Sequence, residues 1–246
     1  MRMICSIFPF LFFSVFSPVF SFAQNAGTDT SFRQAAINKL VSFYHDSVGQ
    51  SSNLYNGMEY ELYPFPFGDG HQYFETTSYV TGDVHYNGVL YSNVPLRYEI
   101  VRDELLLLHY DSIRNINLVK EQIDSFSIGQ HKFLRIPKDS VHQILPEGFY
   151  QQLHPGKTLL LAKHTKTLHE AIEYRTVMFK ITYRKRFYVL KDNVYHPVKN
   201  KKDLLRIFRD KKNELQKYIK QDKLNFRKNT TVAITKLVAH YDQLIK

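Results

Sequence analysis

Two short segments of the chain repeat the pattern Gly-Asp-x-His, which places a carboxylate and an imidazole two residues apart. The first segment contains Asp69 and His71, and the second contains Asp83 and His85. Both side-chain types bind zinc, and residues two apart on a β-strand point to the same face. If the segments lie on neighbouring strands, the four side chains could hold a metal ion. The alternative is that they spread over a solvent-exposed face.

The same pattern opens the metal site of calcineurin-like metallophosphoesterases, but the rest of the chain does not resemble that family. Those enzymes need further Gly-Asp and Asn-His blocks on βα units to hold two metal ions, and the sequence Gly-Asn-His is absent here. Directly after His85, the pair Asn87-Gly88 predicts a two-residue hairpin turn, because type I′ turns need positive φ at both central residues. We therefore expect Asp83 and His85 on the polar face of a hairpin, with Val84 opposite Tyr91.

Other catalytic patterns are also missing. The chain has no Gly-x-Ser-x-Gly elbow, and its single cysteine, Cys5, lies in the N-terminal segment. Carboxylate pairs of the kind that glycoside hydrolases use meet only in the folded protein, so spacing does not reveal them. The sequence therefore favours a protein that is not an enzyme and has no cofactor. An exported hydrolase whose site is assembled across strands is the alternative.

The first residues, MRMICSIFPFLFFSVFSPVFSFAQ, combine one basic residue, a long apolar run and a small residue at the end. This pattern predicts a secretory signal peptide over residues 1–23, with cleavage near Ala23. No later segment approaches the roughly 20 apolar residues of a membrane-spanning helix. We expect an exported protein in the periplasm, at the outer-membrane periphery or outside the cell, with no transmembrane segment in the mature chain.

Three further regions follow the predicted signal peptide. Residues 24–53 are predicted to form an N-terminal helix and linker, because Phe32, Ala36 and Leu40 recur at helical spacing. Residues 54–198 are dense in Tyr, Phe and β-branched residues, in short runs separated by turn residues. These runs, one of which is residues 72–80, predict a mainly β (α+β) fold. The expected arrangement is an antiparallel meander that curls into a barrel- or sandwich-like sheet.

Residues 199–246 are predicted to form a basic helical hairpin, because apolar residues return to helical spacing. The whole chain has a formal net charge of +10, and twelve Lys and Arg residues fall between positions 199 and 228. In an exported protein such a stripe favours anionic lipid or polysaccharide over nucleic acid. The residues proposed to contact such a surface are Lys211, Lys212, Lys217 and Lys220.

Five segments carry a resemblance to other proteins: LYNGMEYELY, GHQYFE, GDVHYNGVLYSNVPLRYEIVRDELLLLH, LLRIFRDKKNELQKYIK and FRKNTTVAITKLVAHYDQL. In these segments and their order, the chain resembles uncharacterised exported β-rich proteins of Bacteroidota bacteria. The resemblance implies a location in the cell envelope and carries no functional residue across. The resulting hypothesis is an envelope binding module for a partner protein or an amphiphile. A β-domain that carries lipid in a cavity is a further alternative.

Overall fold

The computed structural model describes residues 53–138, 145–173 and 176–245, together with six positions between 32 and 40. The predicted signal peptide and most of the predicted N-terminal helix lie outside these residues. The chain divides into two compact units, Met1–Val41 and Ser42–Lys246. All the strands and helices named below belong to the second unit.

The hairpin predicted around Asn87-Gly88 is present and joins β3 (Val80–Tyr86) to β4 (Val89–Glu99). Asn87 and Gly88 have φ values of 51° and 77°, as a type I′ turn requires. Val84 pairs with Tyr91, and both side chains are buried. The local prediction of turn, register and buried face is therefore confirmed.

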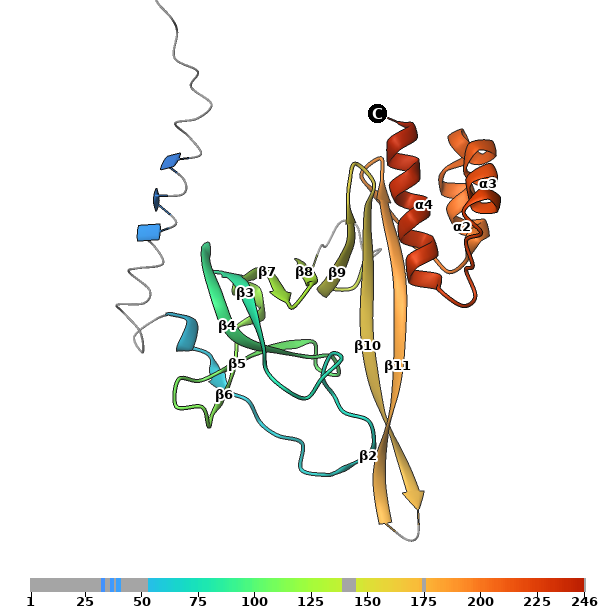
Figure 1. Cartoon of the computed structure of the whole chain (residues 1–246). Helices are drawn as coiled ribbons and strands as arrows, with labels where there is room; N and C mark the ends of the chain where they lie inside the picture. Colours follow the sequence, from blue (N-terminus) through green and yellow to red (C-terminus); the bar gives the residue numbers. More distant parts are fainter. Residues whose placement is uncertain are drawn as a thin grey trace, which may run out of the picture. The chain divides into compact units, whose positions relative to one another are not determined.

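In the part of the chain that the structure describes, the strands form one twelve-stranded sheet made mainly of two antiparallel meanders. Eleven strands follow the order β1-β6-β5-β4-β3-β7-β8-β9-β10-β11-β12, and β2 lies off this path, beside β11. One meander runs from β3 to β6, the other from β7 to β12, and they meet where β3 pairs with β7. The longest strands, β10 and β11, form an extended hairpin (Figure 1). The remaining strands are β1 (Met58–Glu59), β2 (Phe67–Asp69), β5 (Glu104–Leu108), β6 (Asn115–Asn117), β7 (Ile123–Ile128), β8 (His131–Ile136), β9 (Gly148–Pro155), β10 (Leu159–Glu173), β11 (Thr176–Lys191) and β12 (Val194–Val198).

The predicted mainly β architecture is confirmed, but the sheet is not closed into a barrel. It is also mixed rather than wholly antiparallel, because β2 pairs with β11 in parallel. In the β10–β12 half, apolar residues such as Leu160 and Val189 are buried against helical residues such as Leu237. The C-terminal helices thus cover apolar strand surface that a barrel would have to bury by closing on itself.

Aromatic rings fill the space enclosed by strands β3 to β9. Phe126 and Phe133 stack with their ring centroids 4.7 Å apart, and Tyr98 and Phe149 meet them edge-on. All four side chains are buried and belong to one hydrophobic cluster. Ring pairs in these geometries stabilise a core beyond their buried area alone. This region is a packed core.

The C-terminal region contains helices, as predicted, but the first predicted helix is broken into two. Phe208 interrupts it with non-helical dihedral angles (φ −99°, ψ 41°), and its ring stacks on Tyr241 at 4.0 Å. No helix among the described residues is both long enough and apolar enough to cross a membrane. The helical segments are η2 (Asn53–Tyr55), η3 (Lys120–Gln122), α2 (Lys201–Ile207), η4 (Arg209–Lys211), α3 (Lys212–Gln221) and α4 (Thr230–Leu244).

Candidate functional site

The second Gly-Asp-x-His segment uses both of its polar side chains in local contacts. The Asp83 carboxylate accepts hydrogen bonds from the Asn93 backbone N–H at 3.1 Å and from the Ser127 hydroxyl at 3.4 Å. His85 Nδ1 lies 2.9 Å from a carboxylate oxygen of Asp124, on the neighbouring strand β7. Asp83 therefore links β3 to its hairpin partner β4 and to β7. His85 forms an exposed pair with Asp124.

The first segment lies elsewhere in the sheet. Asp69 ends β2, where it pairs in register with Lys180 of β11. His71 Nδ1 accepts a hydrogen bond from the Tyr73 backbone N–H at 3.2 Å. Within the part of the chain that the structure describes, no three His, Cys, Asp or Glu side chains are arranged to hold a metal ion. The two Asp-x-His pairs are thus not brought together into one metal site.

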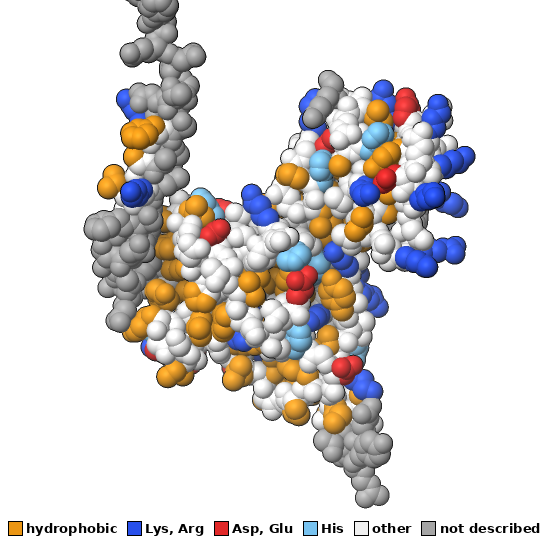
Figure 2. Space-filling view, in the orientation of Figure 1, with side chains coloured by type: hydrophobic (Ala, Val, Ile, Leu, Met, Phe, Trp, Pro, Cys, Tyr) orange, Lys and Arg blue, Asp and Glu red, His pale blue; other side chains and the backbone are white. Residues whose placement is uncertain are grey.

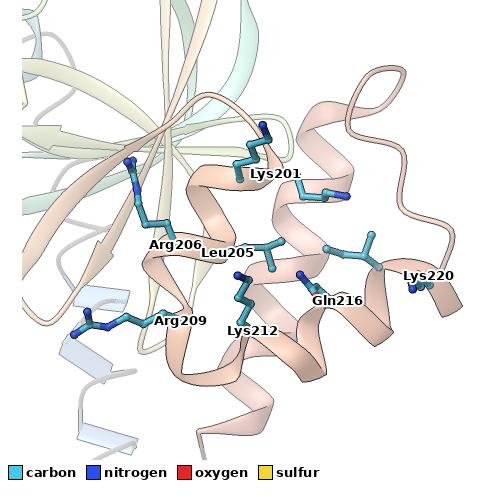
Figure 3. A pocket seen from close by; sticks show the side chains of 9 residues that line it. Lys201, Leu205, Arg206, Arg209, Lys212, Gln216 and Lys220 are labelled. Carbon is cyan, nitrogen blue, oxygen red and sulfur yellow. The ribbon is translucent and has the colours of Figure 1, made fainter.

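A groove of about 700 Å³ between α2 and α3 contains the densest positive charge of the C-terminal region. We call it the basic groove. Figure 3 shows its side chains projecting from both helices, and Figure 2 shows Lys and Arg gathered over this region. Six of its lining residues are cationic: Lys201, Lys202, Arg206, Arg209, Lys212 and Lys220.

No acidic side chain lines the basic groove among the described residues. Of the acids nearby in sequence, Asp203 pairs with one of the lining cations, and Asp210 is bound by residues outside the groove. The Asp203 carboxylate accepts from the Arg206 guanidinium at 3.2 Å and caps the backbone of Lys199. Asp210 is bound by Lys191 Nζ and by the Tyr241 hydroxyl, each at 2.9 Å. Of the six lining cations, Arg206 therefore has an acidic partner, and the other five form no ion pair with a described residue.

The floor of the basic groove is apolar. Leu205 of α2 and Ile219 of α3 line it, and each side chain is almost fully buried against the hydrophobic cluster beneath the helices. In the view of Figure 3, Leu205 lies between the helices, and Arg206 and Arg209 project away from α3. An apolar floor with a cationic rim suits a ligand that joins an anionic group to an apolar part.

Only half of the predicted surface residues line this groove. Lys212 and Lys220 do, whereas Lys211 and Lys217 do not. The pattern of apolar residues predicts one continuous helix across Phe208. It therefore does not predict that the basic side chains of α2 line a groove with those of α3. Along a single straight helix these residues would form a stripe. The break at Phe208 turns α2 against α3 and makes the stripe a groove.

Comparison of the chain with protein-family models, with curated proteins and with solved structures finds no match in any of the three. The chemistry of the site must therefore be argued from its own geometry. That geometry is a cationic groove with an apolar floor on a helical appendage of a β-sheet.

Proposed function

We propose that this protein is a non-enzymatic binding module of the cell envelope that holds an anionic amphiphile in the basic groove. The observation that carries the proposal is a groove lined by six cationic side chains together with Leu205 and Ile219, with no acid among the described lining residues. Lys and Arg bind phosphate groups as charged hydrogen-bond donors. The ligand class is a lipid with a phosphate-bearing headgroup.

The apolar floor favours a lipid over a polysaccharide. A glycan offers anionic groups to the rim but has no apolar chain for Leu205 and Ile219. Each Lys or Arg close to an anionic membrane surface contributes about 1 kcal/mol of attraction. Several such residues at one place give useful affinity without a deep pocket, and they also make it sensitive to salt.

The predicted export of the protein also supports a lipid as the ligand. The signal-like segment over residues 1–23 would place the mature chain where it meets lipid headgroups. The alternative of a β-domain that carries lipid inside is disfavoured, because aromatic rings fill the core between β3 and β9. The alternative of a hydrolase has no described group of metal-binding side chains to support it.

Co-sedimentation with vesicles tests the proposal. The wild-type protein should bind vesicles that contain phosphatidylglycerol, and it should not bind vesicles of phosphatidylcholine alone. The variant Lys201→Gln/Arg209→Gln/Lys212→Gln should bind the anionic vesicles about tenfold more weakly or worse, since it removes three rim charges.

The matched control removes the same charge from neighbouring positions outside the groove. Lys211→Gln/Lys217→Gln/Lys223→Gln should retain most of the binding. Equal losses from both triple variants would mean diffuse charge attraction and would overturn the groove as the site. Binding to a soluble polyanionic glycan such as heparin, without binding to vesicles, would favour the polysaccharide source instead.

A further inference from the structure

A second cavity, of about 480 Å³, lies on the sheet away from the basic groove. We call it the histidine cleft. Most of its polar residues come from β8, β9, β10 and β11 and from the segment that follows β2, and Thr231 comes from α4. The residues that matter for its chemistry are Glu75, His131, Gln151, His164, Tyr183 and Lys185. The register of β10 and β11 sets His164 opposite Lys185 and Lys166 opposite Tyr183.

A chain of hydrogen bonds runs along the cleft from Tyr183 to Glu75, and each group donates to the next one. Because the Glu75 carboxylate only accepts, His131 must present its proton at Nε2, which lies 3.2 Å from it. His131 Nδ1 is then an acceptor, and the Gln151 amide nitrogen donates to it at 2.7 Å. In this arrangement His131 donates through Nε2 and accepts through Nδ1.

The same direction continues to the other end of the chain. The Gln151 amide oxygen accepts from His164 Nε2 at 2.8 Å, so His164 Nδ1 must accept from the Tyr183 hydroxyl at 2.6 Å. Burial lowers the pKa of His164 to about 3, which keeps this imidazole neutral. The Tyr183 hydroxyl uses its proton in this hydrogen bond, so toward a ligand its oxygen can only accept. The cleft is therefore rigid and preorganised.

Lys185 does not take part in this chain. Its ammonium group makes no hydrogen bond or ion pair with any described residue, and it lies 5.6 Å from the centroid of the Phe187 ring. The side chain is partly buried, and burial lowers its pKa although Glu75 acts in the opposite sense. A partly buried ammonium without a partner is costly. It marks the place where an anion would be stabilised.

The segment over the cleft is held in an unusual conformation. Lys166 Nζ donates to the backbone oxygens of His71 and Tyr73, at 2.6 and 2.5 Å. Glu75, just beyond them, has a φ of 50°, a conformation that few non-glycine residues adopt. Strain of this kind persists where the surroundings impose it and is concentrated at ligand sites.

The charge and the walls of the cleft define the ligand. Lys166 and Lys185 contribute two positive charges, and Glu75 contributes one negative charge. The apolar walls include Phe74 and Ile100. We infer that the histidine cleft binds a small organic monoanion with an apolar body, whose charged group lies at Lys185. Its volume is within the range of sites for small organic ligands.

Titration calorimetry with four eight-carbon probes tests this inference. Octanoate should bind to the wild-type protein, whereas 1-octanol and octylamine, which have the same chain but no negative charge, should bind at least tenfold more weakly. 1-Octanesulfonate then shows whether the site takes any monoanion or requires a planar carboxylate. Equal affinity for octanoate and octanol, or no binding of either anion, would overturn the inference.

Variants locate the binding. Lys185→Met should weaken octanoate binding at least tenfold, and Arg184→Met, next to it on the opposite face of β11, should leave it unchanged. The triple variant of the basic groove should also leave it unchanged, which separates this inference from the proposed function. If the triple variant abolished octanoate binding and Lys185→Met did not, the probe would be in the basic groove and the inference would be wrong.

A second measurement guards against loss of folding. Without a ligand, Lys185→Met should unfold at the same temperature as the wild-type protein or higher, because it removes an unpartnered charge. A clear fall in unfolding temperature would assign Lys185 a structural role and count against the ligand site.

Discussion

At the scale of single residues, Asp103 connects distant parts of the sheet. It lies in the turn between β4 and β5, and its carboxylate accepts a hydrogen bond from the Tyr98 hydroxyl. It also pairs with Lys163 Nζ at 2.9 Å and Lys120 Nζ at 3.2 Å, and accepts from the Phe149 backbone N–H at 3.3 Å. Removing such a group would leave several partly buried donors unsatisfied.

A side chain at Gly148 would disturb these contacts of Asp103. A Cβ atom there would lie 2.0 Å from an Asp103 oxygen and 2.4 Å from Lys163 Nζ, and its φ of +135° disfavours any side chain. We expect Gly148→Ala to lower the free energy of unfolding by about 3 kcal/mol. Urea-induced unfolding followed by circular dichroism measures this change.

Gly129 provides the control for backbone strain without a clash. Its φ is +55°, and a Cβ atom would meet nothing within 4 Å. Gly129→Ala should cost only about 1 kcal/mol, which is the penalty of the left-handed conformation. Equal losses for the two variants would show that the contacts of Asp103 contribute little.

At the scale of elements, Asp242 joins α4 to the connection between β9 and β10. This buried carboxylate lies 2.8 Å from His154 Nε2 and accepts from the Thr158 backbone N–H at 3.1 Å. Gly156 permits the close approach, since a Cβ atom there would lie 1.8 Å from an Asp242 oxygen. The contact links the last helix to the sheet at the turn before the long β10–β11 hairpin.

Asp242→Ala should therefore destabilise the protein by about 2 kcal/mol, because it leaves the buried Thr158 N–H without an acceptor. Asp222→Ala is the matched control in the same helical region. Asp222 forms an exposed pair with Lys236 Nζ at 3.0 Å, and such pairs contribute under about 1 kcal/mol. Thermal unfolding compares the two variants, and a smaller effect at Asp242 than at Asp222 would contradict the anchoring role.

The same scale explains which elements could be predicted. Asn87-Gly88 determines its hairpin locally, so turn, register and buried face follow from the sequence. Residues 72–80 have the composition of a strand, yet Lys166 holds their start in a loop. Before β3 begins at Val80, only the isolated bridge between Tyr73 and Glu99 forms there. A contact more than ninety positions away in the chain leaves no local signal.

The two candidate sites also differ in how far the sequence predicts them. The sequence shows the lysines of α3 as a basic stripe. The groove, however, depends on the break in the helix at Phe208, and the ring of Phe208 stacks on Tyr241. The histidine cleft gives no spacing signal at all. Its hydrogen-bond chain joins Glu75 to side chains of four different strands, which only the sheet register brings together.

At the scale of the whole molecule, two buried titratable groups act on stability in opposite directions. Burial raises the pKa of Glu99 to about 7, with Glu104 adding to the rise, while two backbone N–H groups and the Arg102 charge oppose it. Burial also lowers the pKa of His164 to about 3, with smaller contributions from the nearby lysines 163 and 185 and from His131. Glu99 belongs to β4 and His164 to β10.

For Glu99, the folded protein holds its proton more tightly than the unfolded chain does. Between the ordinary pKa of 4.5 and the folded value of about 7, the unfolded chain loses the proton first. Stability should therefore fall as the pH rises through this window, and it should level off above it. The effect amounts to a few kcal/mol, because one pKa unit corresponds to about 1.4 kcal/mol.

For His164, the sign is reversed. The unfolded chain takes up a proton below the ordinary pKa of 6.5, while the folded protein resists protonation down to about 3. Stability from this group is complete above pH 6.5 and is lost as the pH falls towards 3. From pH 4.5 to 6.5 the contributions of the two groups oppose each other, so the profile of the wild-type protein should be flatter than that of either variant.

Urea unfolding of Glu99→Gln and His164→Gln across pH 4 to 8 separates the two contributions. The stability of Glu99→Gln relative to the wild-type protein should rise from pH 4.5 to 7, because the Gln side chain cannot lose a proton. The relative stability of His164→Gln should rise in the other direction, as the pH falls below 6.5. Profiles that stay parallel to that of the wild-type protein would show that neither group is coupled to folding, and that the histidine cleft is more open to water than its geometry implies.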